Sequence, residues 1–498
     1  MEKMYYITKS IWRRWSWKKT VCALIALVLL LGISGCGSEK TPEPESKTDG
    51  LCVGFGRTDI TPEISVPLSG FGNTSMRMSK TVARKLYATC IAITDADNTT
   101  VLLVSIDLQS SGGAVLSARS LISQSTGVPE QNIFLCATHT HAGPDFSSSE
   151  PSIAEYIAEM IPAVCRSAED AMDNRKPAKM YAGSVETEGL NFVKHYQYVK
   201  QDGTVSYFGD NFGDSVIDST TSHTSDVDQT MHLVKFTREG EKDIVLANWR
   251  AHPLLEGAAN KYDVSADFVG AFREAMELKG NCQFAFFQGA AGNINSSSRI
   301  PQERRTQDSA EYGALLAGYA REGLEAATEQ TDTKIRSRQI QLTADINHDT
   351  DAVVGGATIV RSVWTSTNDA ATTLQAGQPY GIRSPYQANA IINRAAMAET
   401  DTMELSAVSI GGQFAIVTAP VELFDGISSQ TEEQTAFQTL FTLGYTNGYY
   451  GYIPTAAAFE YTCYESDVCW FKPGIGEQIQ DNFVDMLQQL YAETEGAS

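Results

Sequence analysis

Two of the seven histidines in this 498-residue chain lie two positions apart, at His139 and His141, within the segment Thr-His-Thr-His-Ala-Gly-Pro of residues 138–144. An apolar run with the composition of a buried strand, 132–137, directly precedes them. Side chains that follow the end of such a strand lie where α/β proteins build ligand sites, and neutral imidazole is a good zinc ligand. The pattern favours a metal or catalytic site over histidines that bond only to backbone groups of a turn.

A third histidine occupies an equivalent place after another apolar run. Residues 244–249 predict a strand, and the sequence Arg-Ala-His-Pro that follows puts His252 just beyond its end. Asp267 comes next at loop distance, and two interpretations of it carry equal weight: a carboxylate that orients a ligand, or the N-cap of a helix that begins at Phe268. His252 therefore joins His139 and His141 as a candidate ligand.

A carboxylate and several tyrosines follow a third strand-like run. Residues 413–418 lead through Ala-Pro-Val into Glu422, which predicts a carboxylate at the start of a helix. On its own, a glutamate in a first helical turn is explained by the helix dipole. The segment 444–455 then holds four tyrosines, a density typical of a packed core or of the wall of a binding site.

The elements that position these residues alternate between strands and helices. The predicted buried strands are 100–106, 132–137, 244–249, 283–287 and 413–418, and the predicted amphipathic helices are 152–172, 309–327 and 477–491. This alternation predicts an α/β fold with mixed β-sheets flanked by helices. Two stretches without periodicity, 210–228 and 349–378, are predicted to be long surface loops. No repeat interrupts residues 51–498, so we expect one large domain.

The N-terminus has the pattern of an export signal. Basic residues precede an apolar segment, 21–31, that ends in Ile-Ser-Gly-Cys, so residues 1–35 are expected to be a signal peptide. The small-residue ending is similar to the site at which bacterial lipoproteins are cut and acylated, here on Cys36. The alternative is a transmembrane anchor, but the apolar run is short for a spanning helix. Residues 36–50 are polar and predict a flexible tether.

Charge and cysteine content narrow the class of protein. The formal net charge is −22, and because residues 1–35 contain six basic residues and one Glu, the remainder carries about −27. Such acidity excludes nucleic acid as a partner, and any attachment to a membrane is expected to come from the lipid on Cys36. The closely spaced Cys463 and Cys469 are the best candidates for a disulfide, although a pair of free thiols is nearly as well supported.

Four segments together resemble one family. The opening Val-Gly-Phe-Gly-Arg-Thr-Asp-Ile-Thr-Pro of 53–62, the Thr-His-Thr-His string, Asn248-Trp249 with His252-Pro253, and the Asn-x-Tyr-x-x-Tyr-Ile-Pro-Thr of 447–455 occur in the order found in neutral/alkaline non-lysosomal ceramidases. The resemblance implies the fold of that family's N-terminal catalytic domain. It also implies an amidohydrolase that uses Zn²⁺ and acts on ceramide or a related N-acyl lipid.

The resemblance also implies roles for particular residues. The zinc ligands would be His139, His252, Glu422 and Tyr452, and His141 would lie beside the metal as a proton shuttle or oxyanion donor. Tyr464 is similar to a second functional tyrosine of the family. Substrate-binding roles fall to Tyr449 and to the pair Lys194 and His195, which stand where the family has an arginine. Zinc in such a site lowers the pKa of a bound water to roughly 7, which supplies a nucleophile for an amide carbonyl.

The sequence departs from the family at three points. Asn295 takes the place of a functional serine, and an asparagine can hydrogen-bond a substrate but cannot act as a nucleophile. Lysine or histidine at 194–195 is not a bidentate donor equivalent to arginine. The family continues into a C-terminal β-sandwich domain, which has no counterpart in the 498 residues. The resemblance therefore covers the catalytic domain alone.

Three functional hypotheses follow. The first is an exported, membrane-anchored zinc amidase that acts on ceramide or a related N-acyl lipid. The second retains the zinc site but replaces the substrate with another ester or amide, because Asn295 departs from the family serine. The third is a lipoprotein that binds a ligand on this scaffold without catalysis. All four implied zinc ligands are present in the sequence, which favours the two catalytic hypotheses over the third.

Overall fold

The computed structural model describes residues 50–71, 76–209, 217–306 and 308–496. The signal peptide, Cys36 and nearly all of the tether that the sequence predicts lie outside these residues. Among the helices of the described ranges, none combines the length and the hydropathy that crossing a bilayer requires.

A nine-stranded mixed sheet forms the largest element of the described residues. Its strands are, in spatial order, β14 (Cys282–Gln288), β12 (Asp243–Trp249), β11 (Thr230–Arg238), β6 (Lys176–Glu186), β1 (Cys52–Asp59), β3 (Tyr87–Thr94), β4 (Thr100–Ile106) and β5 (Ile133–Ala137), with β16 (Thr328–Gln330) paired to β6. Only two register positions join β1 to β6, so the sheet consists of two parts, β1–β5 and β6–β14, that meet along this short contact. The pairs β4–β5 and β12–β14 are parallel.

A four-stranded sheet packs its apolar face against both parts of the large sheet. It contains β17 (Ile335–Asp345), β18 (Thr400–Ile410), β19 (Phe414–Thr418) and β21 (Thr439–Leu443). One cluster of buried side chains includes residues from both parts of the large sheet and from the four-stranded sheet. Examples are Phe134 of β5, Phe236 of β11 and Phe414 of β19. The central core of the molecule thus lies between sheets rather than between a sheet and helices.

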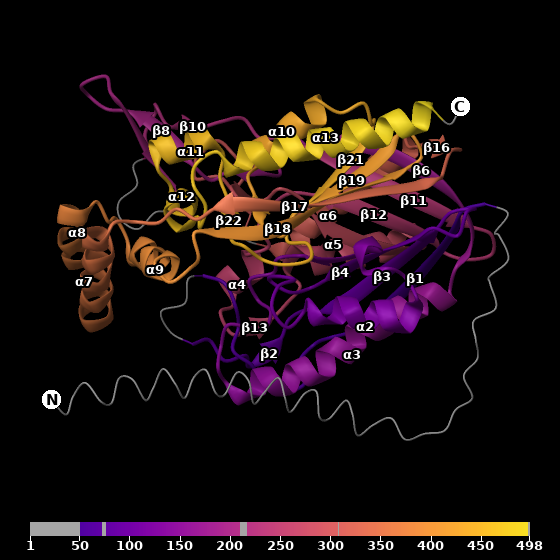
Figure 1. Ribbon diagram of the computed structural model, residues 1–498, viewed down its shortest axis with the longest axis horizontal. Helices are drawn as coiled ribbons and strands as arrows, with labels where there is room; N and C mark the ends of the chain where they lie inside the picture. Colours follow the sequence, from indigo (N-terminus) through magenta and orange to yellow (C-terminus); the bar gives the residue numbers. More distant parts are fainter. Residues whose placement is uncertain (1–49, 72–75, 210–216, 307, 497–498) are drawn as a thin grey trace. The chain divides into compact units, whose positions relative to one another are not determined.

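Helices cover the outer face of each sheet surface (Figure 1). The pair α2 (Ser117–Thr126) and α3 (Pro151–Asp173) packs on β1, β3 and β4, and the pair α5 (Asp267–Gly280) and α6 (Ser309–Glu325) packs on the β6–β14 part. The last helix, α13 (Ile475–Glu495), runs along the four-stranded sheet with α10 (Asp425–Glu433) beside it. Mixed sheets flanked by helices are therefore the observed architecture, as the sequence predicts.

Close packing of α3 on β1 depends on two glycines. A Cβ atom at Gly54 would lie 1.8 Å from the carbonyl oxygen of Ala171, and one at Gly56 would lie 2.1 Å from that of Ser167. Both carbonyls belong to α3, whose apolar residues recur every three or four positions from Ile153 to Ala171. The helix backbone therefore rests directly on the strand.

The remaining elements are short or lie outside the sheets. The helices are α4 (Leu255–Ala259), α7 (Asp351–Thr367), α8 (Ala370–Gly377), α9 (Pro385–Arg394), α11 (Ala456–Tyr461) and α12 (Tyr464–Val468), with short 3-10 turns at Glu130–Asn132 and Gln378–Tyr380. The strands are β2 (Thr81–Val82), β7 (Phe192–Val193), β8 (Tyr196–Val199), β9 (Val205–Phe208), β10 (Ser222–His223), β13 (Asp263–Val264), β15 (Ile294–Asn295), β20 (Glu422–Leu423) and β22 (Tyr452–Ile453).

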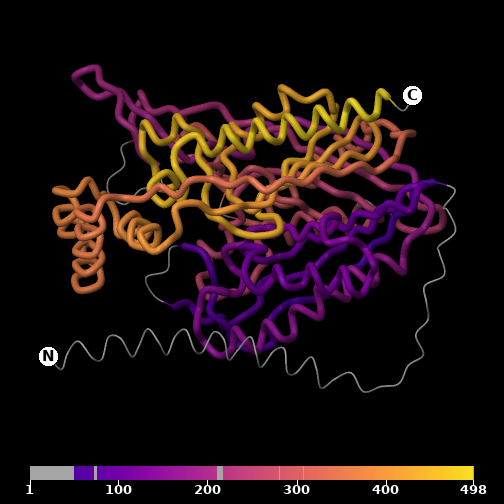
Figure 2. The backbone as a smooth tube through the Cα atoms, viewed as in Figure 1, coloured from indigo at the N-terminus to yellow at the C-terminus, as the bar shows by residue number. Residues whose placement is uncertain are grey.

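All five strands and all three helices predicted from the sequence are present, with ends shifted by a few residues. The predicted loop over 349–378 is wrong: it forms α7 and α8, which stand apart from the sheets in the orange part of the trace (Figure 2). Their N-termini are capped by the side chains of Thr350 and Asp369, which accept hydrogen bonds from backbone N–H groups. Of the predicted loop 210–228, residues 217–228 contain only the two-residue β10, and 210–216 lie outside the described residues.

The disulfide considered for Cys463 and Cys469 does not form. Both are free, buried thiols at opposite ends of α12. The Cys463 thiol contacts the Ser466 hydroxyl, and the Cys469 thiol contacts the carbonyl of Phe471. Burial raises the pKa of the Cys469 thiol to about 12, so this side chain behaves as a small apolar residue.

Candidate functional site

His139 and His141 lie in the loop that follows β5, as the sequence predicts. The backbone N–H of His139 donates to the carbonyl of Leu108, and that of His141 donates to the carbonyl of Pro253. The His139 backbone is left-handed, with φ of 68°. Its ring is oriented by Nδ1, which lies 2.7 Å from the carbonyl oxygen of Gln109. The neutral ring then carries its proton on Nδ1 and presents the Nε2 lone pair.

His252 is held in the same manner at the end of β12. Its backbone N–H donates to the carbonyl of Ile294 at 3.0 Å, and its Nδ1 lies 3.2 Å from the same oxygen. A carbonyl partner on Nδ1 again leaves Nε2 as the nitrogen with a free lone pair. Two histidines from different strands of the large sheet thus carry the tautomer that metal ligands use.

Glu422 does not begin a helix, contrary to the prediction. It opens the two-residue strand β20, which pairs in parallel with β22 so that Glu422 lies opposite Tyr452. Helix α10 begins only at Asp425. The difference arises because residues 420–422 bond to 450–452 of the Tyr-rich segment, through the Glu422 N–H to the Gly451 carbonyl and the Tyr450 N–H to the Pro420 carbonyl. This pairing places two of the implied ligands side by side.

The candidate ligand atoms converge. Glu422 Oε2 lies 3.2 Å from His139 Nε2 and 3.4 Å from His252 Nε2. The Tyr452 hydroxyl lies 3.5 Å from His252 Nε2. Zinc bonds of 2.0–2.1 Å in tetrahedral geometry place neighbouring donor atoms about 3.3 Å apart. The separations and the donor types of His139, His252, Glu422 and Tyr452 therefore fit a single zinc ion.

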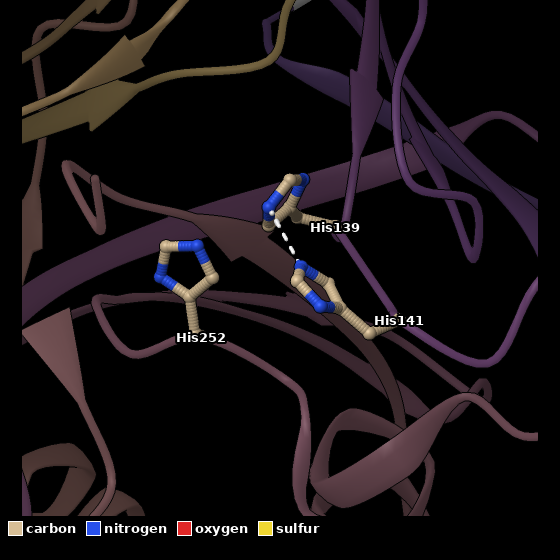
Figure 3. A group of neighbouring side chains, drawn as sticks. All are labelled: His139, His141 and His252. Atoms are coloured by element: carbon tan, nitrogen blue, oxygen red, sulfur yellow. Dashed lines mark hydrogen bonds between the residues drawn. The ribbon is translucent and has the colours of Figure 1, made fainter. Parts of the chain in front are cut away.

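His141 belongs to the same group. The resemblance implies a position beside the metal, and in the structure its ring lies within hydrogen-bond distance of a candidate ligand. Its Nε2 lies 3.2 Å from Nε2 of His139, and Figure 3 shows the rings of His139, His141 and His252 turned toward one another. The three rings meet edge-on, with centroids 4.9–5.5 Å apart. Its other ring nitrogen, Nδ1, is buried and has no hydrogen-bond partner among the described residues. His141 can therefore act as a further ligand or exchange a proton next to one.

The charges in the group are mutually dependent. Burial alone would raise the pKa of the Glu422 carboxyl, but His139 and His252 hold that pKa well below its usual range. Burial, together with the nearby Lys194 ammonium, lowers the pKa of His252, and burial lowers that of His141 well below its ordinary value. A carboxylate and neutral imidazoles are the protonation states in which these groups bind a metal.

The hydroxyl groups of two tyrosines orient the Glu422 carboxylate. The Tyr449 hydroxyl donates to Glu422 Oε1 at 2.5 Å, and the Tyr445 hydroxyl donates to Glu422 Oε2 at 3.4 Å. The Tyr445 ring also stacks on His139, with centroids 4.3 Å apart. Tyr449 does not line the cavity described next, so its position fits orientation of Glu422 rather than the substrate contact implied by the resemblance.

A cavity of about 350 Å³ opens onto the group. Its walls come from Phe71, His141, Lys194, His252, Leu254, Asn295, Tyr386, Tyr452 and Tyr464. The Tyr464 ring meets both Tyr452 and Tyr386 edge-on at 5.8 Å, which gives the cavity an aromatic wall. Tyr464 therefore stands where a substrate contact is expected.

Lys194 and His195 have different positions. Lys194 lines the cavity, where its ammonium lies 5.5 Å from the centre of the Tyr452 ring and 2.7 Å from Glu465 Oε1. His195 is not among the residues that line this cavity and is buried between Glu465 Oε2, at 2.7 Å, and the Tyr461 hydroxyl, at 3.1 Å. Lys194 can reach a substrate, whereas His195 supports the shared carboxylate.

Asn295 lies in β15 and contributes to the cavity wall. Its side-chain oxygen is buried and has no hydrogen-bond partner among the described residues. A second, larger cavity of about 700 Å³ adjoins the first and shares the side chains of Leu254 and Asn295 with it. Asn295 is thus placed to accept a hydrogen bond from a ligand that reaches from one cavity to the other.

Asp267 binds backbone N–H groups at the starts of two helices. Its carboxylate accepts hydrogen bonds from the N–H groups of Phe268, at 2.7 Å, and Glu256, at 2.6 Å, which lie in the first turns of α5 and α4. The side chain is buried, and burial raises the pKa of its carboxyl to about 6. The N-cap of α5 is Ala266, which makes no side-chain cap bond, so Asp267 is the first residue of this helix and not the N-cap of a helix that begins at Phe268.

Sequence reasoning missed Tyr445, Glu465, Tyr386 and Phe71. Phe71 packs edge-on against His141 at 5.3 Å, yet it lies 70 positions before that residue in a turn without a motif. Glu465 follows Tyr464 directly, but no sequence pattern pairs it with Lys194, which it contacts only in the folded chain. Tyr445 belongs to the Tyr-rich segment, but only the pairing of β20 with β22 reveals which of its rings faces Glu422.

Comparisons with known proteins identify a similar family and a similar fold. Residues 51–284 match the family model described as neutral/alkaline non-lysosomal ceramidase, N-terminal. A neutral ceramidase from Pseudomonas aeruginosa has the same fold, with a TM-score of 0.65 and 19% identity over 89% of this chain and 75% of its own. A ceramidase complexed with C2 aligns with the same score, identity and share of this chain, over 76% of its own. A search of curated protein sequences finds no significant match.

Proposed function

We propose that this chain, whose residues 51–284 match the model of the neutral/alkaline non-lysosomal ceramidase family, is a zinc-dependent amidohydrolase that cleaves the amide bond of ceramide or a related N-acyl lipid. The observation that carries the proposal is the convergence of His139 Nε2, His252 Nε2 and Glu422 Oε2, with the Tyr452 hydroxyl beside them, at the wall of a cavity. Zinc bound by these four residues would activate water and polarise a carbonyl oxygen.

The protein's own side chains perform the remaining tasks. His141 lies within hydrogen-bond distance of His139 and borders the cavity, so it can take the proton that the attacking water loses and pass it to the departing amine. Lys194, fixed by Glu465, presents a cation to the cavity wall and can stabilise negative charge on the carbonyl oxygen. The aromatic wall of Tyr386, Tyr452 and Tyr464 provides apolar area for a lipid chain.

Removal of the metal tests this proposal directly. The full-length chain, extracted in detergent, is treated with a strong zinc chelator and then supplied with Zn²⁺, and hydrolysis of a fluorescent ceramide is followed throughout. We expect hydrolysis to stop on chelation and to return when zinc is restored. Hydrolysis that persists in protein from which all metal has been removed would rule out a zinc mechanism.

A second candidate keeps the zinc site and changes the substrate. Asn295 replaces the family's serine, and its unpartnered side-chain oxygen lies on the wall shared by two cavities. This favours a related ester or amide whose polar group donates a hydrogen bond to Asn295. A panel of N-acyl amides and esters would reveal such a preference. If Asn295→Ser raises ceramide turnover and lowers turnover of the best alternative substrate, the second candidate holds.

The proposed cell-surface location rests on the sequence before residue 50. We propose that the chain is exported by residues 1–35 and anchored to a bacterial membrane through a lipid on Cys36. Expressed in a bacterial host, the wild-type chain should partition into the detergent phase after extraction, and Cys36→Ser should partition into the aqueous phase. Equal partitioning of the two chains would refute the anchor while leaving the catalytic proposal untouched.

A further inference from the structure

A buried network of charges lies behind the candidate zinc ligands and lines neither cavity. Its centre is Arg250, which is 2% exposed. The guanidinium contacts Asp425 Oδ1 at 2.9 Å, Asp228 Oδ2 at 2.8 Å and Glu432 Oε1 at 3.1 Å. Glu432 is also bonded to His232, at 3.2 Å. Ion pairs with three carboxylates fix the position of a guanidinium firmly.

The chain positions of two members are the key observation. Arg250 comes two residues before His252, in the loop after β12, and Asp425 comes three residues after Glu422, at the start of α10. His252 follows β12 of the large sheet and Glu422 lies in the small β20–β22 sheet, so no sequence-local interaction sets the distance between them. The Arg250–Asp425 ion pair directly connects the loop that carries His252 to the segment that carries Glu422, and neither member of the pair is a candidate ligand.

Further hydrogen bonds make the connection rigid. The Asp425 N–H donates to Asn293 Oδ1 at 2.8 Å, and the Asp228 N–H donates to Asp425 Oδ2 at 3.1 Å. The turn that contains Asn293 also binds both ligand loops, because the His252 N–H donates to Ile294 and the Gly292 N–H donates to Leu423. A Cβ at Gly292 would lie 2.6 Å from the Glu422 carbonyl oxygen, so this turn rests on the Glu422 backbone.

On this basis we infer that Arg250 and Asp425 are positioning residues, which hold His252 and Glu422 at the separation that one metal ion requires. The inference rests on the proposed zinc site and adds to it a pair that touches neither metal nor substrate. Partners that orient metal ligands typically change metal affinity by 10–100-fold when they are replaced. Loss of this pair should therefore weaken zinc binding while the substrate cavity stays intact.

The experiment measures zinc affinity of full-length chains by competition with a fluorescent chelator. The variants are Arg250→Lys, which keeps the charge but loses the forked geometry, and Asp425→Asn, which keeps the shape but loses the charge. The matched control is Arg57→Lys, because Arg57 also forms a partly buried ion pair, with Glu277 at 2.8 Å, but joins β1 to α5 away from the ligand loops. Thermal unfolding of each metal-free chain reports its stability separately.

We expect both variants to bind zinc 10–100-fold more weakly than the wild type, with KM unchanged and with kcat rising toward the wild-type value as zinc is added. Arg57→Lys should lower stability and leave zinc affinity unchanged. If folded Arg250→Lys and Asp425→Asn bind zinc as tightly as the wild type, the pair is merely structural and the inference is wrong. A wild-type chain that binds no zinc would instead overturn the proposed function. Should Arg250→Lys fail to fold, Asp425→Asn alone decides the question.

Discussion

His139 combines a ligand's ring orientation with a backbone conformation that is costly for a histidine. Its φ of 68° belongs to the left-handed region, which side-chain-bearing residues adopt only where surrounding contacts enforce it. Here the contacts are the hydrogen bonds of its backbone N–H to Leu108 and of its ring to Gln109. A non-glycine residue held in this way at a candidate metal site is a mark of a functional constraint.

A pair of substitutions distinguishes the role of the His139 ring as a metal ligand from the strain in its backbone. His139→Ala and His139→Gly should both lose zinc and lower activity by more than about 100-fold, because even partners that only orient ligands cost 10–100-fold. Glycine adopts positive φ without penalty, so His139→Gly should be more stable to unfolding than His139→Ala by about 1 kcal/mol. Zinc analysis, hydrolysis assays and urea unfolding check the three outcomes. Retention of stoichiometric zinc in both variants would exclude His139 as a ligand.

The buried carboxyl of Asp267 should make the stability of the protein depend on pH. Its folded-state pKa of about 6 lies above the value of about 3.9 for an unfolded chain, so folding favours the protonated carboxyl. The resulting stabilisation is fully present below pH 3.9 and is lost as the pH rises through 6. Relative to Asp267→Asn, which does not titrate, the wild type should therefore lose on the order of 2 kcal/mol of unfolding free energy between pH 4 and pH 7. Chemical unfolding at several pH values measures the difference, and a difference that does not vary with pH would contradict it.

At the scale of single residues, the sequence identified the histidines because they follow recognisable strands. Glu422 and Tyr452 came only from the family resemblance, since a glutamate before a helix and a tyrosine in an aromatic run have ordinary structural explanations. Glu422 then proved to lie in a strand. The hydrogen bonds that form this strand join it to residues thirty positions later, and no local sequence pattern predicts them.

The elements that carry the site depend on close contacts between backbones. Helix α3 lies so near β1 that the Ala171 carbonyl occupies the space of a Gly54 side chain. Because β1 pairs with β3, and β3 with β4, any displacement of α3 disturbs the sheet part that ends in the His139 loop. The opening Val-Gly-Phe-Gly motif of the chain is therefore explained by packing rather than by chemistry.

Gly54→Ala should destabilise the protein strongly, because the backbone of α3 must move to admit the methyl group. Overpacking of this kind typically costs about 1–3 kcal/mol, and a contact with backbone should reach at least the upper end. Gly318→Ala is the matched control: it lies in α6 with no atom near its Cβ, so it should stabilise the helix by about 0.5–1 kcal/mol. Urea unfolding of both variants gives the comparison. Equal stabilities for the two would show that the packing of α3 is not as close as described.

Element prediction succeeded where burial imposes a clear period and failed where it does not. Strands such as β4 and β19 are buried along their whole length, and α3 has one continuous apolar stripe. Helix α7 instead packs mainly on α8 and α9, outside the sheets, and only Gly356, Ala357 and Val360 are buried in it. So small a buried face gives α7 no clear apolar period, which is why the sequence of this stretch predicts a loop.

At the scale of the whole molecule, three sheet surfaces share one core and direct their loops to one site. The ligand loops follow β5, β12 and β19, and the Tyr-rich segment follows β21. The sequence predicts mixed sheets flanked by helices, but it contains no signal for the packing of the four-stranded sheet on both parts of the large one. That arrangement follows from apolar side chains hundreds of positions apart, such as Phe134 and Phe414, which meet only in the folded chain.

The most direct measurement of the central claim is the zinc content of the purified full-length chain together with its hydrolysis of a fluorescent ceramide, for the wild type and for Glu422→Ala. The account predicts about one zinc per wild-type chain and ceramide cleavage, both lost in Glu422→Ala because the convergent carboxylate is gone. Zinc without ceramide cleavage would retain the metal site and direct the search to other amides and esters. A folded wild-type chain without stoichiometric zinc would contradict the account.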